Sequence, residues 1–362
     1  MTIPTTYSVA LLLTVLTMLC WGSWANTMKL AGKWRFELFY FDYTFGVVLA
    51  ALLAALTFGS IESGSVDLAT PSFSFLDNIS VASKRQMLLA TGGGAVFNLA
   101  NLLLVAAIAV AGMSVAFPVG IGIALIVGVA LNYLIKPAGS PTLLFGGSAV
   151  ILAAIIVTAL AHSAHSLSKA TGEEPDVKTV PGARAVHRPG VRRGPSPLKG
   201  ILLSIGSGIL MGLFYPLVEM SKKGEIGLGP YAAAFFFSLG VLVTTPVFNL
   251  FFMNLPVEGD PVGFGQYFQG TARQHLLGVL GGAIWATGAV ANFVAASAPQ
   301  SVNVGPAISY GIGQGATLVS ALWGLLVWKE FAGATAGVRV RITLMLILFV
   351  AGLTMLSIAP LY

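Results

Sequence analysis

Residues 86–135 read QMLLATGGGAVFNLANLLLVAAIAVAGMSVAFPVGIGIALIVGVALNYLI, a run of 50 residues without Lys, Arg, Asp or Glu. A membrane-spanning helix needs about 20 apolar residues. The stretch is therefore long enough for two helices, divided at the turn-prone Ala111-Gly112-Met113-Ser114. The whole chain is 56% apolar and only 9% charged, where soluble proteins are about 25% charged. This composition indicates an integral membrane protein and excludes a soluble enzyme, a disordered chain and a nucleic-acid binder.

Seven further windows also lack charged side chains, and the longest of them, 274–328, again fits two helices, divided at Ala298-Pro299-Gln300-Ser301. A charge at the centre of a spanning helix costs roughly 2.5–3.5 kcal/mol on insertion scales, so spanning helices avoid one. The windows together predict ten spanning helices in an all-α fold. They lie at residues 8–28, 38–59, 87–110, 113–135, 142–163, 200–221, 230–252, 275–297, 302–328 and 340–360.

The basic residues predict the orientation of these helices. Loops after the odd-numbered helices hold 14 Lys and Arg residues, and loops after the even-numbered ones hold five. Basic residues collect in cytoplasmic loops, so both chain termini are expected outside. Residues 164–199 are rich in Pro, Gly and Arg and lack apolar periodicity, which predicts a basic cytoplasmic linker. The net charge of +6 is therefore interpreted as a membrane signature, and Arg192-Arg193 as a contact for lipid headgroups.

The two halves of the chain resemble each other. Gly93-Gly94-Ala95 begins 25 residues before Pro118, and Gly281-Gly282-Ala283 begins 25 residues before Pro306. Five helices per half is an odd number, so the second half enters the membrane from the opposite side. We therefore expect an inverted repeat, with residues 1–163 as the first half, 164–199 as the linker and 200–362 as the second half. Inverted repeats are typical of secondary transporters.

Pro118 and Pro306 lie a few residues inside the predicted fourth and ninth helices. Two interpretations stay open for both. A proline within a helix removes an amide donor and breaks or bends the helix. A proline in the first turn is tolerated, because the amide there has no helical partner.

Several motifs resemble those of known transporter families. Phe41-Asp42-Tyr43-Thr44, Asn98-Leu99-Ala100-Asn101 and Leu131-Asn132-Tyr133 resemble the ureide permease family. Lys33-Trp34-Arg35-Phe36-Glu37 and Leu125-Ile126-Val127-Gly128 resemble the rhamnose–proton symporter and its glucose/ribose porter relatives. Both belong to the drug/metabolite transporter superfamily, and the resemblance implies two inverted sets of five helices.

The resemblance also bears on energy source and location. Plant ureide permeases carry a nucleotide-loop-like motif in the central segment, but residues 164–199 contain no G-x-x-x-x-G-K-[ST]. ATP binding is therefore not expected, and a bacterial relative is favoured. The predicted location is a bacterial inner membrane, crossed several times.

Polar and aromatic side chains within the spans are the candidates for solute binding. Asn98 and Asn101 share one helix face, and an amide inside a bilayer faces a wet cavity or hydrogen bonds to another helix. Trp24 and Tyr215 lie at comparable places in the two halves, although Tyr215 also fits an aromatic belt at the membrane surface. The predicted substrate-binding residues are Trp24, Asn98, Asn101, Tyr215, Trp285, Asn292, Tyr310 and Gln314. Such groups suit a sugar or a nitrogen heterocycle.

Proton coupling requires an ionisable group in or beside the solute path. Glu37, Asp42 and Glu219 are the acidic residues close to the ends of candidate helices. A structural role competes with coupling for each. Glu37 and Asp42 open a helix, where the dipole favours negative charge, and Glu219 precedes Lys222 at the spacing of a helical ion pair.

Other functions fit the sequence less well. Four scattered histidines and the single Cys20 provide neither a metal site nor a disulfide. An intramembrane enzyme would need a cluster of His, Asp or Cys at one depth, and a sensor would need a soluble output domain. An exporter of lipophilic cations would need a carboxylate at mid-span. The sequence therefore predicts, without cofactor or metal, a permease for a small polar solute such as a ureide or nucleobase, with a sugar porter as the alternative and protons as the candidate coupling ion.

Overall fold

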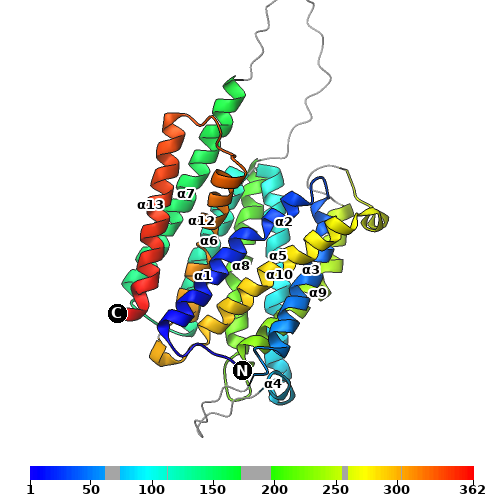
Figure 1. The fold of residues 1–362 in the computed structure, drawn as a ribbon, viewed down its shortest axis with the longest axis vertical. Helices are drawn as coiled ribbons and strands as arrows, with labels where there is room; N and C mark the ends of the chain where they lie inside the picture. The colour runs from blue at the N-terminus through cyan, green and yellow to red at the C-terminus, as the bar shows by residue number, and fades with distance from the viewer. Residues whose placement is uncertain (62–73, 112, 173–196, 255–259, 303) are drawn as a thin grey trace, which may run out of the picture.

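The computed structural model describes residues 1–61, 74–111, 113–172, 197–254, 260–302 and 304–362, and these residues are helical with short connections. Figure 1 shows the helices as one bundle. They are α1 (Tyr7–Ser23), α2 (Ala25–Leu30), α3 (Phe36–Leu56), α4 (Phe75–Val81), α5 (Lys84–Ala111), α6 (Met113–Ile135), α7 (Pro141–Gly172), α8 (Pro197–Ser221), α9 (Pro230–Asn254), η1 (Phe264–Gln269), α10 (Ala272–Ala296), η2 (Gln300–Val302), α11 (Pro306–Gly313), α12 (Ala316–Leu322), η3 (Trp323–Val327), α13 (Ala336–Ile358) and η4 (Ala359–Leu361).

Nine helices in the described part of the chain are long and apolar enough to cross a membrane. The multi-pass, all-helical character predicted from the sequence is thereby confirmed. The remaining predicted span, 113–135, is present as the helix α6, but it is not among these nine. The tenth crossing stays a prediction.

Several helix boundaries differ from the predicted ones. α7 continues to Gly172, beyond the expected end at residue 163, because the residues that follow are compatible with a helix. The linker predicted at 164–199 is therefore partly helical at its start, and its central residues 173–196 lie outside the described part. The first span is divided at Trp24 into α1 and α2. A short helix, α4, was not predicted and begins with a capping box formed by Ser74 and Asp77.

The region predicted as one helix, 302–328, is divided into the shorter helices α11, α12 and η3. α11 begins at Pro306, with Gly305 as its N-cap, so this proline starts a helix and does not break one. The break comes later, at Gln314-Gly315, before α12 begins. A glycine there has no side chain to stabilise the helix. Pro118 falls within the range of α6, and its side chain lies outside the described part.

Two helix crossings bring backbones into direct contact through glycine. α3 crosses α10, where a Cβ atom added to Gly282 would lie 1.8 Å from the carbonyl oxygen of Tyr43. α5 crosses α9, where a Cβ added to Gly240 would lie 1.9 Å from the carbonyl oxygen of Thr91. Small residues permit this close approach, which replaces the hydrophobic effect as a source of packing energy inside a membrane.

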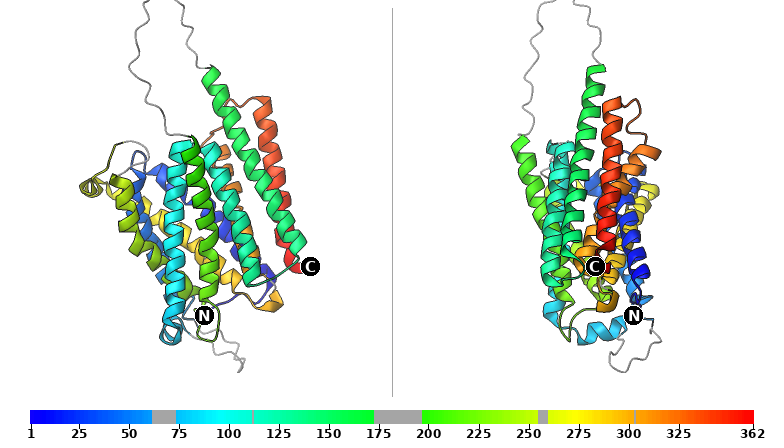
Figure 2. Two further views of the ribbon diagram at one scale, coloured as in Figure 1. Left: turned by 180° about the vertical axis from the view of Figure 1, so that it is seen from behind. Right: turned by 90° about the vertical axis from the view of Figure 1, so that its left-hand side faces the viewer.

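Both ends of the chain lie toward the same end of the bundle, as Figures 1 and 2 show. The Tyr7 hydroxyl at the start of α1 donates to the carbonyl oxygen of Ser357 near the end of α13. α7 and α13 run side by side at the edge of the bundle (Figure 2), with Gly147 against the backbone of Gly352. Which membrane face holds the termini stays a prediction from the loop charges.

Candidate functional site

Buried aromatic rings gather where α3, α5, α9 and α10 meet and where α1 ends. The ring of Phe97 lies 4.4 Å from that of Trp285 and 5.5 Å from that of Phe237, between ring centroids. The ring of Tyr43 lies 5.0 Å from that of Trp24. We define the central cluster as Trp24, Tyr40, Tyr43, Phe97, Asn98, Asn101, Phe237 and Trp285. It contains four of the predicted substrate-binding residues: Trp24, Asn98, Asn101 and Trp285.

The amide of Asn98 ties three helices together within this cluster. Its Oδ1 accepts a 2.8 Å hydrogen bond from the Tyr40 hydroxyl of α3, and its Nδ2 donates to Oγ1 of Thr244 on α9 at 2.9 Å. Nδ2 also lies 3.2 Å from Oγ1 of Thr245. Asn101, one turn along α5, donates from Nδ2 to the Tyr40 hydroxyl at 3.2 Å. Because its hydrogen bonds are already made inside the protein, Asn98 positions its neighbours and has little capacity left for a solute.

Tyr43 differs from its neighbours. Its side chain is 0% exposed, and its hydroxyl forms no hydrogen bond within the described residues. The ring is stacked on Tyr40, with centroids 5.2 Å apart. Buried polar groups are nearly always paired, so an unpaired one needs an explanation such as a missing ligand.

The other predicted binding residues form a separate network at the junction of α8, α10 and α11. The Tyr215 hydroxyl donates to Oδ1 of Asn292 at 2.5 Å, and Nδ2 of Asn292 donates to the carbonyl oxygen of Ser309 at 2.9 Å. The Tyr310 hydroxyl donates to the carbonyl oxygens of Ala124 and Met211. Tyr215 is fully buried, so it does not lie in an aromatic belt at the membrane surface. Gln314 is buried at the break between α11 and α12.

Two of the three acidic candidates pair with permanent cations. Glu37 forms a salt bridge with Arg35 at 2.7 Å, and Glu219 forms one with Lys222 at 2.5 Å. The second pair is the helical ion pair that the spacing predicted. It lies beside Lys136, whose ammonium donates to the carbonyl oxygens of Ala296 and Ala298 at the end of α10. Burial, with the nearby Lys222, lowers the pKa of Lys136.

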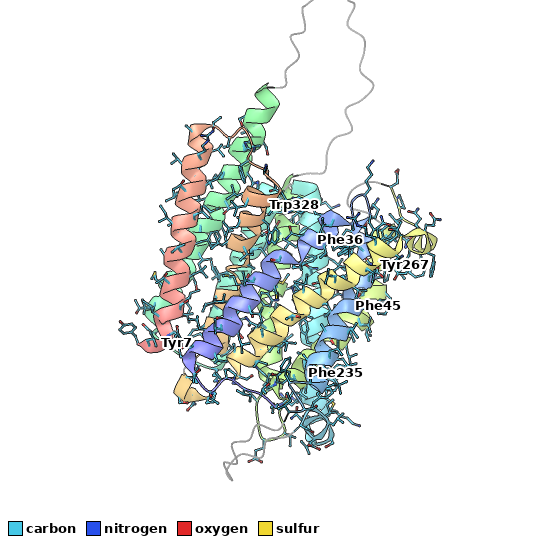
Figure 3. The ribbon with its side chains drawn as sticks, in the orientation of Figure 1. Tyr7, Phe36, Phe45, Phe235, Tyr267 and Trp328 are labelled. Atoms are coloured by element: carbon cyan, nitrogen blue, oxygen red, sulfur yellow. The ribbon has the colours of Figure 1, made fainter. Side chains whose placement is uncertain are left out.

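Asp42 has different partners. Its carboxylate accepts a 2.6 Å hydrogen bond from the Tyr267 hydroxyl and lies 2.8 Å from Nδ1 of His275. The side chain of Asp42 is 5% exposed, whereas the His275 side chain is 27% exposed. Burial and the Asp42 carboxylate raise the pKa of Tyr267 above its ordinary value, so the phenol donates. Figure 3 shows Tyr267 near the end of the bundle opposite Tyr7. Asp42 is thus a buried carboxylate whose partner, the His275 imidazole, is partly exposed.

Six residues of these sites were not predicted: Tyr40, Tyr43, Phe97, Phe237, Tyr267 and His275. Tyr40 and Tyr43 lie three apart and share a helix face with the central cluster. That spacing was available in the sequence, but it lies within the run Phe39-Tyr40-Phe41-Asp42-Tyr43, where aromatic residues cover every face. Tyr267 and His275 gave no signal, because their partner Asp42 is distant in the chain and only the fold brings them together.

These observations define a multi-pass helical membrane protein with aromatic and polar groups buried at its centre. Its helices cross backbone to backbone through glycine, and no metal-binding group of His, Cys, Asp and Glu occurs among the residues that the structure describes.

The chain belongs to the ureide permease family: the model of that family, Ureide permease, matches residues 39–177 and 186–359. This is a family of membrane transporters, so the protein is a permease and not an enzyme. Ureide permease 1 of Arabidopsis thaliana is 24% identical, with 94% of each chain covered. Ureide permease 5 of the same plant is also 24% identical, over 96% of this chain and 93% of its own. A solved crystal structure shares the fold, with a TM-score of 0.54 and 17% identity over 95% of this chain and 96% of the other.

Proposed function

We propose that this permease carries a small, planar, nitrogen-rich solute, a ureide or a nucleobase, by alternating access through the central cluster. The names of its relatives support a ureide. The observation that carries the proposal is the unpaired hydroxyl of Tyr43, buried among stacked aromatic rings. Aromatic faces accept a flat ring by stacking, and the free hydroxyl supplies a hydrogen bond to one of its carbonyl oxygens.

The two glycine crossings support an inverted repeat. The first crossing joins α3, the second predicted span of the first half, to α10, the third span of the second half. The other crossing joins α9, the second span of the second half, to α5, the third span of the first half. Gly46 and Gly282 form the first crossing, and Gly240 and Gly94 form the second. A two-fold axis in the membrane plane would exchange these crossings, and transporters built this way bind solute between the halves. The central cluster lies between the two crossings, because Tyr43 belongs to the first and Phe237 to the second.

Contacts at the two ends of the bundle fit the same arrangement. Lys29 at the end of α2 pairs with Glu330 after η3, and its ammonium lies 4.7 Å from the ring centroid of Trp328. At the opposite end, Lys223 after α8 donates to the carbonyl oxygen of Ile135 at the end of α6 at 2.9 Å. Each contact joins the end of a half's first helix to the other half. We infer that these contacts close the path at the two membrane surfaces in turn.

Asp42 and His275 are the proposed site of proton coupling. A carboxylate held by Arg or Lys must break its ion pair to take up a proton, as Glu37 and Glu219 would. Asp42 instead pairs with the imidazole of His275, at 2.8 Å. Asp42 also lies next to Tyr43 in the chain. A change in the protonation or contacts of Asp42 can therefore shift Tyr43 of the central cluster, because both lie on the same turn of α3.

Solute uptake is the direct test. The purified protein is reconstituted into liposomes, and the uptake of labelled allantoin, uracil, rhamnose and glucose is measured with and without an imposed pH gradient. We expect uptake of a ureide or nucleobase, increased by the gradient. Uptake of monosaccharides alone would replace the proposal with the sugar-porter alternative, and the absence of any uptake or exchange would contradict a transport function.

Tyr43→Phe is expected to weaken solute binding and leave the fold intact. The substitution removes a hydroxyl that has no partner in the protein, so the unfolding temperature should stay unchanged. A lost hydrogen bond to the solute is worth about 0.5–1.5 kcal/mol, which predicts a rise of about twofold to twelvefold in KM for uptake. The concentration dependence of uptake in proteoliposomes provides the measurement.

Tyr40→Phe is the matched comparison. Its hydroxyl bonds to both Asn98 and Asn101, so its loss should lower the unfolding temperature, with a cost of about 1–3 kcal/mol for the unpaired amide groups. If Tyr43→Phe destabilised the protein as much as Tyr40→Phe, the Tyr43 hydroxyl would have a partner in the protein and the binding role would fail.

A further inference from the structure

An apolar groove runs along the outside of α5, α6 and α8. It is lined by Leu89 and Val96 of α5, Leu131 and Leu134 of α6, and Leu213 and Leu217 of α8, and it encloses about 740 Å³. Pro216 also lines it. The side chains of Leu134 and Leu88 nearby are among the exposed apolar residues. The groove is separate from the central cluster, because none of the residues of that cluster lines it.

One end of the groove is cationic. Arg85 and Lys223 line it together with Gln86, and no acidic side chain is among the lining residues. The Arg85 side chain forms no hydrogen bond or ion pair within the described residues. Gln86 donates from Nε2 to the carbonyl oxygen of Lys223 at 2.8 Å, while its buried Oε1 has no hydrogen-bond partner in the described part of the chain. The mouth of the groove therefore offers positive charge.

The dimensions of the groove match half of a bilayer. α5 begins at Lys84, and α6 and α8 end nearby at Ile135 and Ser221, so the cations lie at the membrane surface. From Arg85 to Val96 the helix rises about 16 Å at 1.5 Å per residue, which is about half the 30 Å hydrocarbon core. An acyl chain that starts at the surface would thus reach the end of the groove near the bilayer midplane.

We propose that this groove is a binding site for one anionic phospholipid. The phosphate lies between Arg85 and Lys223. One acyl chain fills the groove between α5, α6 and α8. A phosphatidylglycerol headgroup fits these cations because its phosphate gives it a net negative charge, whereas a choline headgroup has no net charge. The site links helices of both halves of the chain, because α5 and α6 precede the central segment and α8 follows it.

Lipid binding to the purified full-length protein tests the proposal. Delipidated protein in detergent is titrated with phosphatidylglycerol and with phosphatidylcholine of the same acyl chains, and bound lipid is counted by native mass spectrometry. We expect one phosphatidylglycerol to bind tightly and phosphatidylcholine to bind weakly. A surface cation contributes about fivefold in affinity for an anionic lipid, so Arg85→Gln with Lys223→Gln should weaken phosphatidylglycerol binding about 30-fold.

Lys84→Gln is the matched control, because Lys84 is the exposed neighbour of Arg85 and does not line the groove. Its affinity for phosphatidylglycerol should change less than twofold. A second variant, Leu89→Trp, fills the groove and should reduce binding while all charges stay in place. Equal binding of the two lipids would overturn the proposal. So would equal losses in Lys84→Gln and the double variant, since the attraction would then belong to the general surface charge. Unfolding temperatures without added lipid establish that each variant is folded.

Discussion

Replacing Gly282 with alanine is expected to destabilise the protein severely and to abolish transport. The added Cβ would lie 1.8 Å from the carbonyl oxygen of Tyr43 and 2.9 Å from the amide nitrogen of Val47. Both are backbone atoms, so no side chain can rotate away, and α10 must separate from α3. Overpacking costs about 1–3 kcal/mol when side chains can adjust, and more when backbones must move. Separation would also pull Trp285 away from Phe97. The unfolding temperature in detergent and uptake in proteoliposomes measure the two effects.

Gly92→Ala is the control for this substitution. Gly92 lies in α5, and a Cβ there would have no atom within 4 Å. Alanine is better than glycine within a helix by roughly 0.5–1 kcal/mol, so this variant should be as stable as the parent or slightly more stable. If Gly282→Ala proved equally harmless, α3 and α10 would not cross as closely as described, and the position of the central cluster would have to be revised.

Asp42→Asn is expected to abolish solute accumulation driven by a pH gradient, with a decrease of more than tenfold. The amide keeps the size of the carboxylate but cannot bind and release a proton. It can still accept the hydrogen bond from Tyr267, so the local structure should survive. The predicted signature is a separation of two activities: uptake against a gradient is lost, whereas exchange of labelled for unlabelled solute continues. Both are measured in the same proteoliposomes.

Asp77→Asn provides the matched control, because Asp77 is an exposed aspartate that caps the short helix α4. It should leave driven uptake within about twofold, since losing part of a helix cap costs roughly 0.5–2 kcal/mol and does not touch the path. His275→Gln should also reduce driven uptake. Driven uptake by Asp42→Asn at the parent rate would exclude this carboxylate as the coupling site, and Glu37 and Glu219 would become the next candidates.

The sequence was sufficient for the broad fold because a bilayer imposes a simple rule on it. Long uncharged windows must be helices, and α3, α5, α8 and α10 lie close to where their windows predict them. The rule does not predict where a helix continues beyond the membrane or where it breaks within a span. The continuation of α7 to Gly172 depends on helix preference beyond the apolar window, and the break at Gln314-Gly315 depends on packing against Trp21 and Met18, which approach Gly313 and Gly315.

The sequence predicted some residues of the candidate site but not the partners that decide their roles. Asn98 could be identified as a buried amide, but whether it faces a solute or another helix depends on Thr244 and Tyr40, which other helices supply. The same holds for Asn292, whose amide is occupied by Tyr215 and Ser309. Periodicity tells which residues share a helix face, but it does not tell what lies opposite that face.

The glycine crossings have a mechanical consequence. Where α3 meets α10, and where α5 meets α9, glycine leaves the two backbones in direct contact, with no side chain between them. If one helix slid along the other at such a crossing, their backbone atoms would clash. Under the proposed alternating access, each crossing is therefore a pivot about which the helices tilt. Displacements are then smallest at mid-membrane and grow toward the two surfaces, where Lys29 with Glu330 and Lys223 with Ile135 would separate by the largest amounts.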